Sequence, residues 1–587
     1  MKESYSKVIQ STKKILKLKF VNFYVLGLNL FCIFAGISYI LIPFNLLLLD
    51  VFWNSFGIIL ILTFFGNIIY TYFISIKLNR GSKIGKRMKL FCTFYVFYIN
   101  LSMGMMLFGN FLFGTSFQQG KANIGFWLLI LGGYFGNLGL GICLSVFNIR
   151  NRNNRDLWSP SVNEVESSAK FLRLRKVTKW STIIICVIIL GFGIYMVYIM
   201  TIAPLQDFSA WLVAIFILPF ALFFSFLILN ATLYLLKKIN LKKRPKLFYS
   251  IGILGVLLST ILLLPHISTP FVYHQTEQNF GTAFGNNWEN EIDSNAKDMF
   301  LKTPFSLPAY FLGMPQKECI IETDTLFYDG EGIKLHYDAY YVEGDRSNLP
   351  GNSSVIISIH GGGWTGGSKG QGNLRFINSY FAAQGYVVFD IEYGLINEAN
   401  LFQMTGTPSY VIGNFSIEDQ LRHIGIFIKQ LNSTEFQDRY NSLNLDSVFI
   451  TGGSAGGHLT VASSLLISNG SYTGWFGSSV SIKGMMPLYP GDPPERYGNN
   501  TVLNPELYYV TENSPPCLML QGEKDFCIFK TQQIKRSYST ASNDDCCVIY
   551  FPFQGHANDI YHTGHFNQFL LYYAERFLYL CTHDKIA

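Results

Sequence analysis

The chain has 587 residues, of which 49% are hydrophobic, 16% aromatic and only 14% charged. This length excludes a single ordinary domain, so at least two units are expected. The net charge of +7 averages two unlike halves, because residues 1–267 carry 27 Lys and Arg against six Asp and Glu, whereas residues 268–587 carry 18 against 32. The overall charge therefore hides a basic half and an acidic half.

The basic half contains seven long apolar stretches that predict a bundle of transmembrane helices. Each has about 20 residues or more, enough for a helix to cross a hydrocarbon core of roughly 30 Å. The stretches are apolar on all faces and nearly free of charge, which excludes the buried helices of a soluble protein. The predicted spans are Asn22–Leu48, Val51–Ile76, Leu90–Phe113, Ile124–Phe147, Ser181–Ile202, Leu212–Leu236 and Leu247–Ile267.

Basic residues fall in alternate loops between these spans. Of the 27 Lys and Arg, 26 lie in four segments, and only Lys121 lies outside them. The positive-inside rule places such segments, and with them the N-terminus, in the cytoplasm. Seven crossings then put everything after Ile267 on the non-cytoplasmic side. Because juxtamembrane Lys and Arg already have this topological role, we expect no nucleic-acid partner. The segments are Met1–Phe20, Lys77–Lys89, Asn148–Lys179 and Lys237–Lys246.

After a connector-like stretch, residues 268–317, short β-branched strands alternate with helix-length segments. The alternation predicts one α/β domain over 318–587, with a mostly parallel sheet and helices on both faces. The predicted strands are Cys319–Phe327, Lys334–Val342, Val355–Ile359, Val387–Glu392, Ser447–Thr451, Ile482–Leu488, Cys517–Gln521 and Cys547–Phe551. The predicted helices are Ser416–Leu431, Ala455–Ser468, Lys530–Thr540 and Phe566–Cys581.

Two glycine-rich turns follow predicted strands. The sequence HGGGW (His360–Trp364) follows one strand, and GGSAGG (Gly452–Gly457), which contains a G-x-S-x-G pattern, follows another. In open parallel sheets, ligands bind at the carboxyl ends of the strands. A serine on a sharp turn between strand and helix projects its hydroxyl over this edge. We therefore expect Ser454 and the HGGGW turn to contribute to one site.

The glycines of HGGGW are suited to stabilising an oxyanion. A serine that attacks an ester or amide carbonyl creates a negative oxygen, which needs preorganised N–H donors about 3 Å away. Gly361 and Gly362 can offer their amides because no Cβ blocks the approach, and Ala455 offers the amide that follows the serine. A merely tight turn would need one glycine rather than three.

A serine nucleophile also needs a base, and the base needs an orienting acid. Asp525 lies in the turn after one late strand, and His556 lies in the loop after the next. The order Ser454, Asp525, His556 fits the chain order of this class of site. The rival residues are Glu523 and Asp559 as acids and His562 and His565 as bases.

Together, HGGGW, GGSAGGHL, LQGEKD and GHAND resemble α/β-hydrolase esterases of the hormone-sensitive-lipase type, especially their acetylesterase, kynurenine-formamidase and prenylcysteine-methylesterase branches. The resemblance covers about Asp324 to Leu580 and none of the predicted spans. It implies an eight-stranded sheet, no metal and no cofactor. The site residues that it implies are Ser454 as nucleophile, His556 as general base and acid, Asp525 as its partner, and Gly361, Gly362 and Ala455 as the oxyanion hole.

Other residues near the two turns have a structural interpretation beside a functional one. Trp364, with Gly363, either lines an acyl pocket or only covers the glycine turn. His360 is expected to brace the oxyanion loop, and His458 to pack rather than act as a second base. The family often has Asp-Tyr-Arg-Leu after its fourth strand, whereas this chain has IEYGL (Ile391–Leu395), so a structural arginine is missing.

The sequence thus predicts a membrane-anchored serine hydrolase that cleaves a carboxylic ester outside the cytoplasm, with short acyl groups such as acetyl favoured by analogy alone. One alternative is a transacylase or a lipid or glycan deacylase that uses the membrane bundle. Another is a non-enzymatic, hydrolase-like ectodomain for adhesion or sensing, which would have no use for an oxyanion hole. The expected partners are an ester substrate and the lipid bilayer.

Overall fold

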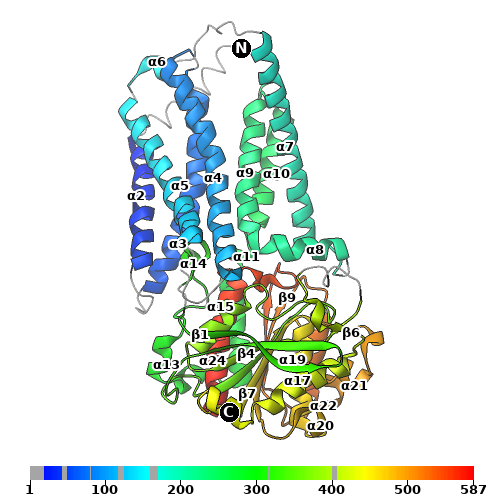
Figure 1. Ribbon diagram of the computed structural model, residues 1–587. Coiled ribbons are helices and arrows are strands. Elements are labelled where there is room, and N and C mark those ends of the chain that lie inside the picture. The colour runs from blue at the N-terminus through cyan, green and yellow to red at the C-terminus, as the bar shows by residue number, and fades with distance from the viewer. Residues whose placement is uncertain are drawn as a thin grey trace.

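The computed structural model describes residues 19–41, 49–79, 81–116, 124–151, 153–158, 169–205, 207–314, 317–398, 403 and 406–586. A bundle of long helices forms one end of the molecule and an α/β domain forms the other (Figure 1). Parts of the predicted basic loops, residues 1–18 and 159–168 among them, lie outside the described residues, as do Lys121 and residues 42–48 of the first predicted span.

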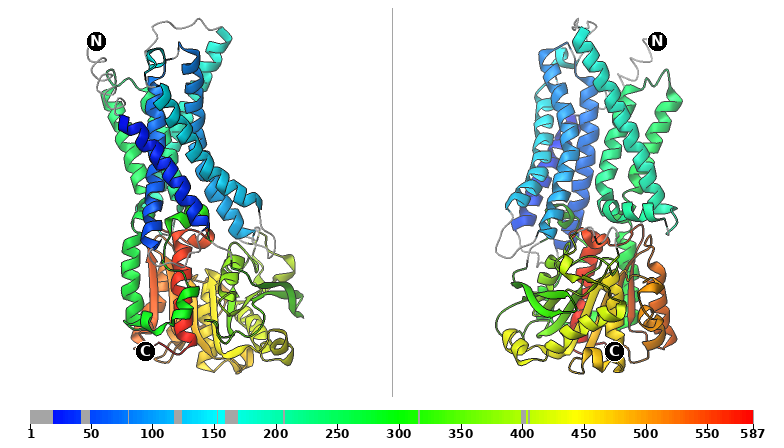
Figure 2. Two further views of the ribbon diagram at one scale, coloured as in Figure 1. Left: turned by 90° about the vertical axis from the view of Figure 1, so that its left-hand side faces the viewer. Right: turned by 45° about the vertical axis from the view of Figure 1, so that its right-hand side comes forward.

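The bundle consists of two groups of helices, which stand apart in the right-hand view (Figure 2). The first group contains α2 to α5, and the second contains α7, α9 and α10. The long helices are α2 (Lys19–Leu41), α3 (Leu49–Lys77), α4 (Lys83–Thr115), α5 (Ile124–Asn151), α7 (Ala169–Thr201), α9 (Ala221–Lys238) and α10 (Pro245–Ile261). The short elements are α6 (Arg155–Trp158), α8 (Phe208–Ile217) and η1 (Leu218–Phe220).

Six helices in the described part of the chain are long and apolar enough to cross a membrane, so the predicted count of seven is wrong by this measure. The predicted last span, Leu247–Ile267, is broken. Helix α10 ends at Ile261, and the separate helix α11 (Leu264–Ile267) has Pro265 in its first turn. Proline cannot donate the hydrogen bond that would continue α10. Helix α10 still packs against α7 and α9 and leads the chain to the α/β domain (Figure 1).

The predicted connector is largely helical and joins the two units firmly. Its helix α14 inserts among the ends of α2 to α5. There the Asn54 side chain donates to the carbonyl of Phe305 at 3.0 Å and accepts from the amide of Leu307 at 3.0 Å, and the Asn110 side chain donates to the carbonyl of Phe311 at 2.9 Å. The connector's elements are α12 (Thr269–Phe284), η2 (Trp288–Glu291), α13 (Ser294–Met299) and α14 (Leu307–Leu312).

The α/β domain is built on an eight-stranded sheet of order β1-β2-β4-β3-β7-β8-β9-β10, as expected. The pairs β1–β2 and β2–β4 are antiparallel, and the other pairs are parallel. Each strand agrees with its predicted range within three residues at either end. The strands are β1 (Ile320–Gly330), β2 (Ile333–Tyr341), β3 (Ser354–Ile359), β4 (Val387–Ile391), β7 (Asn444–Gly453), β8 (Ile482–Leu488), β9 (Cys517–Gly522) and β10 (Cys546–Phe551).

All residues of β3, β4 and β9 are buried, which is typical of parallel strands covered on both faces. A small second sheet pairs β5 (Leu395–Ile396) with β6 (Ile412–Gly413). The four predicted helices of the domain are confirmed, whereas α15, α18 and several short turns were not predicted. The helices and 3₁₀ turns are α15 (Leu374–Ala382), η3 (Ser409–Val411), α17 (Ile417–Gln430), α18 (Thr434–Arg439), α19 (Ala455–Asn469), α20 (Thr473–Phe476), η4 (Glu495–Tyr497), α21 (Asn500–Leu503), α22 (Glu506–Tyr509), α23 (Ile528–Thr540), η5 (Asn558–Ile560) and α24 (His565–Thr582).

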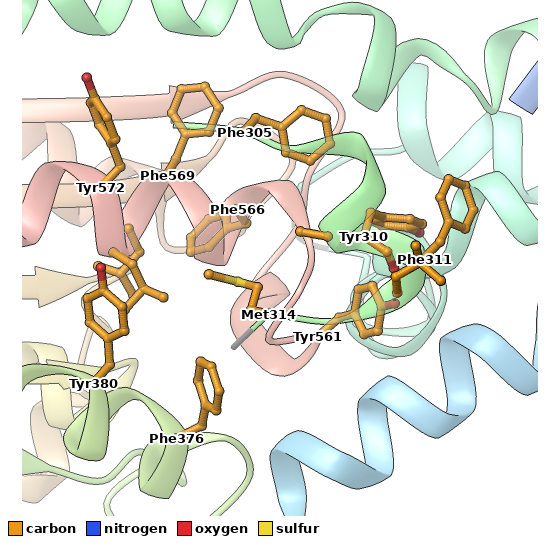
Figure 3. Close-up of a cluster of buried hydrophobic side chains, with 14 of the residues drawn as sticks. Phe305, Tyr310, Phe311, Met314, Phe376, Tyr380, Tyr561, Phe566, Phe569 and Tyr572 are labelled. Atoms are coloured by element: carbon orange, nitrogen blue, oxygen red, sulfur yellow. Dashed lines mark hydrogen bonds between the residues drawn. The ribbon is translucent and has the colours of Figure 1, made fainter. Parts of the chain in front are cut away.

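An aromatic core connects the bundle to the domain (Figure 3). Tyr310 of α14 donates to the carbonyl of Pro219 in η1 at 2.9 Å, and its own carbonyl accepts from the Tyr561 hydroxyl at 2.6 Å. Phe311 packs edge-on against Phe64 of α3 at 6.3 Å between ring centroids. Because these rings are buried and their hydroxyls are paired, the two units are expected to keep a fixed relative orientation.

Glu575 of α24 fastens the connector to the domain from within the core. Its carboxylate is fully buried and accepts hydrogen bonds from the Leu301 amide at 2.7 Å, the Tyr380 hydroxyl at 2.6 Å, the Gln384 amide at 2.8 Å and Arg576 at 2.8 Å. Buried charge is tolerated only where such partners replace water.

We predict that Glu575→Ala destabilises the protein by about 3 kcal/mol, because it removes the charge that pairs with the buried Arg576 and leaves the Leu301 amide, the Tyr380 hydroxyl and the Gln384 amide without this acceptor. The midpoint of thermal unfolding in detergent should fall by about 5 to 10 °C. Glu512→Ala, at an exposed position of the same domain, is the control and should leave the midpoint unchanged. Equal midpoints for the two variants would refute the role of Glu575.

Candidate active site

The carboxyl ends of the parallel strands face the bundle (Figure 1). Lys524, just after β9, donates from Nζ to the carbonyl of Thr201, the last residue of α7, at 2.6 Å. A Cβ added to Gly555, in the loop after β10, would lie 3.0 Å from the Cβ of Ala214 in α8. The candidate residues therefore lie at the junction of the two units.

Ser454 occupies a strained turn between β7 and α19. Its backbone has φ 57° and ψ −120°, a conformation that costs energy for a residue with a Cβ. Two hydrogen bonds hold the turn: the Ser454 amide donates to the carbonyl of Leu488 at 3.0 Å, and its carbonyl accepts from the Gly491 amide at 2.8 Å. A Cβ on Gly456 would lie only 2.1 Å from the Ile359 carbonyl oxygen, so only glycine allows this approach of α19 to β3.

Ser454, His556 and Asp525 form a continuous hydrogen-bonded chain. Nε2 of His556 lies 2.8 Å from Oγ of Ser454, and its Nδ1 lies 2.9 Å from each carboxylate oxygen of Asp525. A carboxylate can only accept, so Nδ1 carries the hydrogen and Nε2 is left to accept from the serine hydroxyl. Asp525 is fully buried and His556 is 4% exposed, whereas Ser454 is half-buried.

Further hydrogen bonds fix the Asp525 carboxylate. It accepts from the Cys527 amide at 2.9 Å and from the Gln521 side chain at 2.8 Å, and the Gln521 oxygen accepts in turn from the Thr531 hydroxyl at 2.6 Å. Ligand atoms of Asp525, Cys527 and His556 lie within 4.8 Å of one another, a grouping that could also hold a metal ion. The pairing of both carboxylate oxygens with the imidazole accounts for this grouping without a metal.

The rival residues lie elsewhere. Glu523 is exposed. Asp559 accepts from the Tyr489 hydroxyl at 2.6 Å, and burial raises the pKa of its carboxyl. The imidazole of His562 packs edge-on against Phe376 with the ring centroids 4.7 Å apart, and burial lowers its pKa to about 3. His565 packs beside His266, with the ring centroids 5.4 Å apart.

The HGGGW turn places bare backbone beside Ser454. A Cβ on Gly361 would lie 3.4 Å from the Cβ of Ser454, so the two residues are immediate neighbours. Gly362 has φ 121°, and a Cβ there would lie 2.1 Å from the Gly366 carbonyl, so the turn requires glycine at this position. Among the described residues, no acceptor takes a hydrogen bond from the amides of Gly361, Gly362 or Ala455. These donors are available to a ligand.

His360 and Tyr393 brace this turn. Their rings stack with centroids 4.4 Å apart, the Tyr393 hydroxyl donates to the His360 carbonyl at 2.9 Å, and Nδ1 of His360 lies 2.8 Å from the Gly361 carbonyl. Burial lowers the pKa of His360 to about 4, so the ring is neutral at physiological pH. Tyr393 belongs to the IEYGL segment, which therefore still contributes an anchor despite the missing arginine.

Trp364 lies beneath the turn rather than in an open pocket. It is 6% exposed, and its indole N–H donates to Nδ1 of His458 at 3.3 Å. Nε2 of His458 then donates to the Val502 carbonyl at 3.0 Å, and burial lowers the pKa of this histidine to about 3. Gly363, between Gly362 and Trp364, has φ 62° and continues the turn. Trp364 and His458 thus form a packed support under the site.

A strand-to-helix turn with a strained serine, at the carboxyl edge of this eight-stranded sheet, defines a nucleophile elbow. The BD-FAE family model matches residues 341–406, which include the HGGGW turn. The sheet and the turn at Ser454 give the C-terminal domain an α/β-hydrolase-like fold. No curated protein matches the chain.

Solved structures that are similar to part of this chain include esterases. Esterase B from Lactobacillus rhamnosis is 19% identical, over 42% of this chain and 82% of its own, with a TM-score of 0.32. Brefeldin A esterase, described as a bacterial homologue of human hormone-sensitive lipase, is 16% identical, over 46% and 78%, with a TM-score of 0.33. A bacterial heroin esterase is 13% identical, over 46% and 84%, with a TM-score of 0.33.

The bundle adds a residue to the candidate site that was not predicted. Trp211 of α8 lies with its ring centroid 6.3 Å from that of His556 and 5.3 Å from that of Phe526. Phe526 and Tyr489 each lie 4.9 Å from the imidazole. One signal for Trp211 was present in the sequence. It follows a short polar stretch between two apolar ones, and tryptophan is enriched where membrane helices meet water.

We predict that Gly456→Ala disrupts the elbow, because the new methyl group would collide with the Ile359 carbonyl and move Ser454 away from His556. Labelling of Ser454 by a fluorophosphonate should slow by about a hundredfold or more. The control is Gly474→Ala, since a Cβ at that position meets nothing within 4 Å. Normal labelling of Gly456→Ala would contradict the proposed dependence on close packing.

Proposed function

We propose that the protein is a membrane-anchored serine hydrolase that cleaves a carboxylic ester through an acyl-enzyme intermediate. The observation that carries the proposal is the chain of hydrogen bonds from Ser454 through His556 to the buried Asp525. The free amides of Gly361, Gly362 and Ala455 support it, because a module that only binds a partner has no need of such donors beside a strained serine.

The proposed reaction begins when Ser454 Oγ attacks the ester carbonyl and His556 Nε2 takes its proton. The amides of Gly361, Gly362 and Ala455 stabilise the negative oxygen of the tetrahedral intermediate, and each such donor contributes roughly 3 kcal/mol. His556 then protonates the leaving alcohol, and the acyl group remains on Ser454.

In the second half of the proposed reaction, a water molecule gives a proton to His556 and attacks the acyl-enzyme. Collapse of the second tetrahedral intermediate releases the carboxylic acid and returns the proton to Ser454. Asp525 holds the imidazole in the tautomer that each proton transfer requires and stabilises its charged form, without becoming protonated itself.

We predict that a fluorophosphonate labels the wild-type protein and does not label Ser454→Ala. Asp525→Asn should lower kcat for a soluble ester by about 10⁴-fold, because the amide favours the wrong imidazole tautomer. The matched control is Glu523→Gln, at the exposed rival acid two residues earlier, which should retain nearly full activity. Absence of labelling in the folded wild-type protein would refute the proposed hydrolase activity.

We further propose that the hydrolase domain lies on the non-cytoplasmic side of the membrane. The basic loop between α3 and α4 and that between α9 and α10 lie at the end of the bundle away from this domain (Figure 1). Such loops remain in the cytoplasm. Helix α10, which is apolar but shorter than the six long spans, carries the chain from that end of the bundle to the opposite end and so acts as a seventh crossing in this proposal (Figure 1). The chain then enters the hydrolase domain.

This topology predicts that an epitope tag after Ile586 binds antibody on intact cells. The same tag placed between Asn240 and Lys242, in the basic loop that follows α9, should bind antibody only after the cells are permeabilised. Inverted accessibility of the two tags would overturn the proposed sidedness while leaving the hydrolase chemistry untouched.

A further inference from the structure

The segment that follows the HGGGW turn packs directly on the candidate oxyanion hole. The amide of Gly366 donates to the Gly362 carbonyl at 3.0 Å, and a Cβ on Gly367 would lie only 2.3 Å from the Gly361 carbonyl oxygen. The Gly361 carbonyl and the Gly362 amide belong to one planar peptide group. Whatever holds that carbonyl in place therefore also sets the direction of the Gly362 N–H.

Lys369 ties this segment to the outer strands of the sheet. Its ammonium donates to Asp338 of β2 at 2.7 Å and to Asp324 of β1 at 2.5 Å, and its side chain is only 6% exposed. The neighbouring amide of Gly370 donates to the carboxyl group of Asp390 in β4 at 2.7 Å. Burial disfavours the charged ammonium, but the bonds to the two aspartates raise the pKa of Lys369 overall, so this side chain is charged.

The two buried aspartates beneath the segment lie side by side. Asp338 and Asp390 are paired directly across the β2–β4 register, and both are fully buried. Like charges in such positions repel each other. Burial, and then the charge of Asp338, raise the pKa of Asp390 to about 8, so Asp390 is mostly neutral at physiological pH. Asp338 is then the buried carboxylate that Lys369 neutralises, and its second oxygen lies 3.9 Å from Arg375.

This buried ion pair is better explained by the orientation it imposes than by the stability it adds. Apolar side chains of similar size often stabilise a protein as much as a buried ion pair, without the cost of removing two charges from water. A pair between a strand and a turn, however, allows the turn to dock in one geometry only. The turn docked here is the one that carries the oxyanion donors.

We propose that Lys369 is a positioning residue of the oxyanion hole. Through its ion pairs it holds the segment after the turn against the Gly361 carbonyl, and it thereby aims the Gly362 amide at the oxyanion. This inference rests on the proposed hydrolase function. Lys369 does not touch the substrate. Because the oxyanion forms only after Ser454 has attacked, loss of this orientation raises the reaction barrier while substrate binding is retained.

The test compares Lys369→Met with the wild-type full-length protein in detergent, with p-nitrophenyl acetate as the soluble ester. We expect kcat to fall about a hundredfold and KM to change less than about threefold, because one oxyanion donor is misdirected. The affinity for an alkyl trifluoromethyl ketone, whose hemiketal oxygen occupies the same hole, should fall by a similar factor. Lys334→Met is the matched control and should keep wild-type values, because this exposed lysine of β2 forms a surface ion pair with Asp329 at 3.0 Å.

A double variant separates orientation from stability. Lys369→Met alone leaves the buried Asp338 carboxylate without its nearest cation, which should lower the midpoint of thermal unfolding. Lys369→Met combined with Asp338→Asn removes both charges, so the midpoint should recover while kcat stays low. Recovery of kcat together with the midpoint would overturn the positioning role. If neither variant folds, Asp324→Asn weakens the tie from its exposed end and should lower kcat about threefold.

The remaining outcomes separate this inference from the function on which it rests. Unchanged kcat and ketone affinity in folded Lys369→Met, equal losses in Lys334→Met, or unchanged kcat in Asp324→Asn overturn the inference and leave the hydrolase intact. If a fluorophosphonate labels Ser454 but the ester is not cleaved, the labelling rate replaces kcat in each comparison, because phosphonylation also builds negative charge in the hole. Absence of both labelling and hydrolysis in the folded wild-type protein refutes the hydrolase itself.

Discussion

The architecture of the site depends on one strained peptide turn at Ser454. A residue with a Cβ is held at φ 57°, and the cost of this conformation has to be offset by its surroundings. The Ser454 amide donates to the carbonyl of Leu488 in β8, and the Ser454 carbonyl accepts from the amide of Gly491, which follows β8. Glycine at position 456 lets α19 start directly against β3. The serine hydroxyl is consequently aimed out of the sheet edge at His556, where no ordinary turn would place it.

The same sheet edge is also the surface on which the membrane bundle is docked. The aromatic core around Tyr310 and Tyr561 and the buried carboxylate of Glu575 hold the connector between the two units. The contacts of Lys524 with α7 and of Trp211 with His556 follow from this docking. The bundle thus contacts the two loops that carry Asp525 and His556.

Much of this could be predicted from sequence because the informative signals were local. The strands were recognisable from short β-branched runs, and the HGGGW and GGSAGG turns from glycine at positions where a Cβ would collide with backbone. Asp525 and His556 could be placed because each follows a strand that ends at the same edge. The sequence already favoured Asp525 over Asp559 because Asp525 lies in the turn after a strand, whereas the 2.9 Å distance from its carboxylate to the imidazole has no local signal.

What could not be predicted were the contacts between distant segments. Nothing near Trp211 in the chain indicates that it meets a histidine more than three hundred residues later. The connector looked like a linker because its helices are polar in part. Helix α12 packs on β10 and α14 packs on the bundle, and the rings of Phe280 and Phe284 also contact α24. The prediction of the last span was wrong for a local reason, because Pro265 interrupts an otherwise apolar stretch.

The packing of α12 on β10 has a consequence for how the chain is made. Helix α12 is synthesised soon after the bundle, whereas β10 is among the last strands to emerge. The two elements are joined by a hydrogen bond of 3.1 Å from the Asn279 side chain to the carbonyl of Val548. The α/β domain therefore cannot close until translation is nearly finished. A nascent chain halted before β10 would leave the apolar face of α12, with Val272, Phe280 and Phe284, uncovered, which makes the late stages of biosynthesis the period when this protein most needs a chaperone.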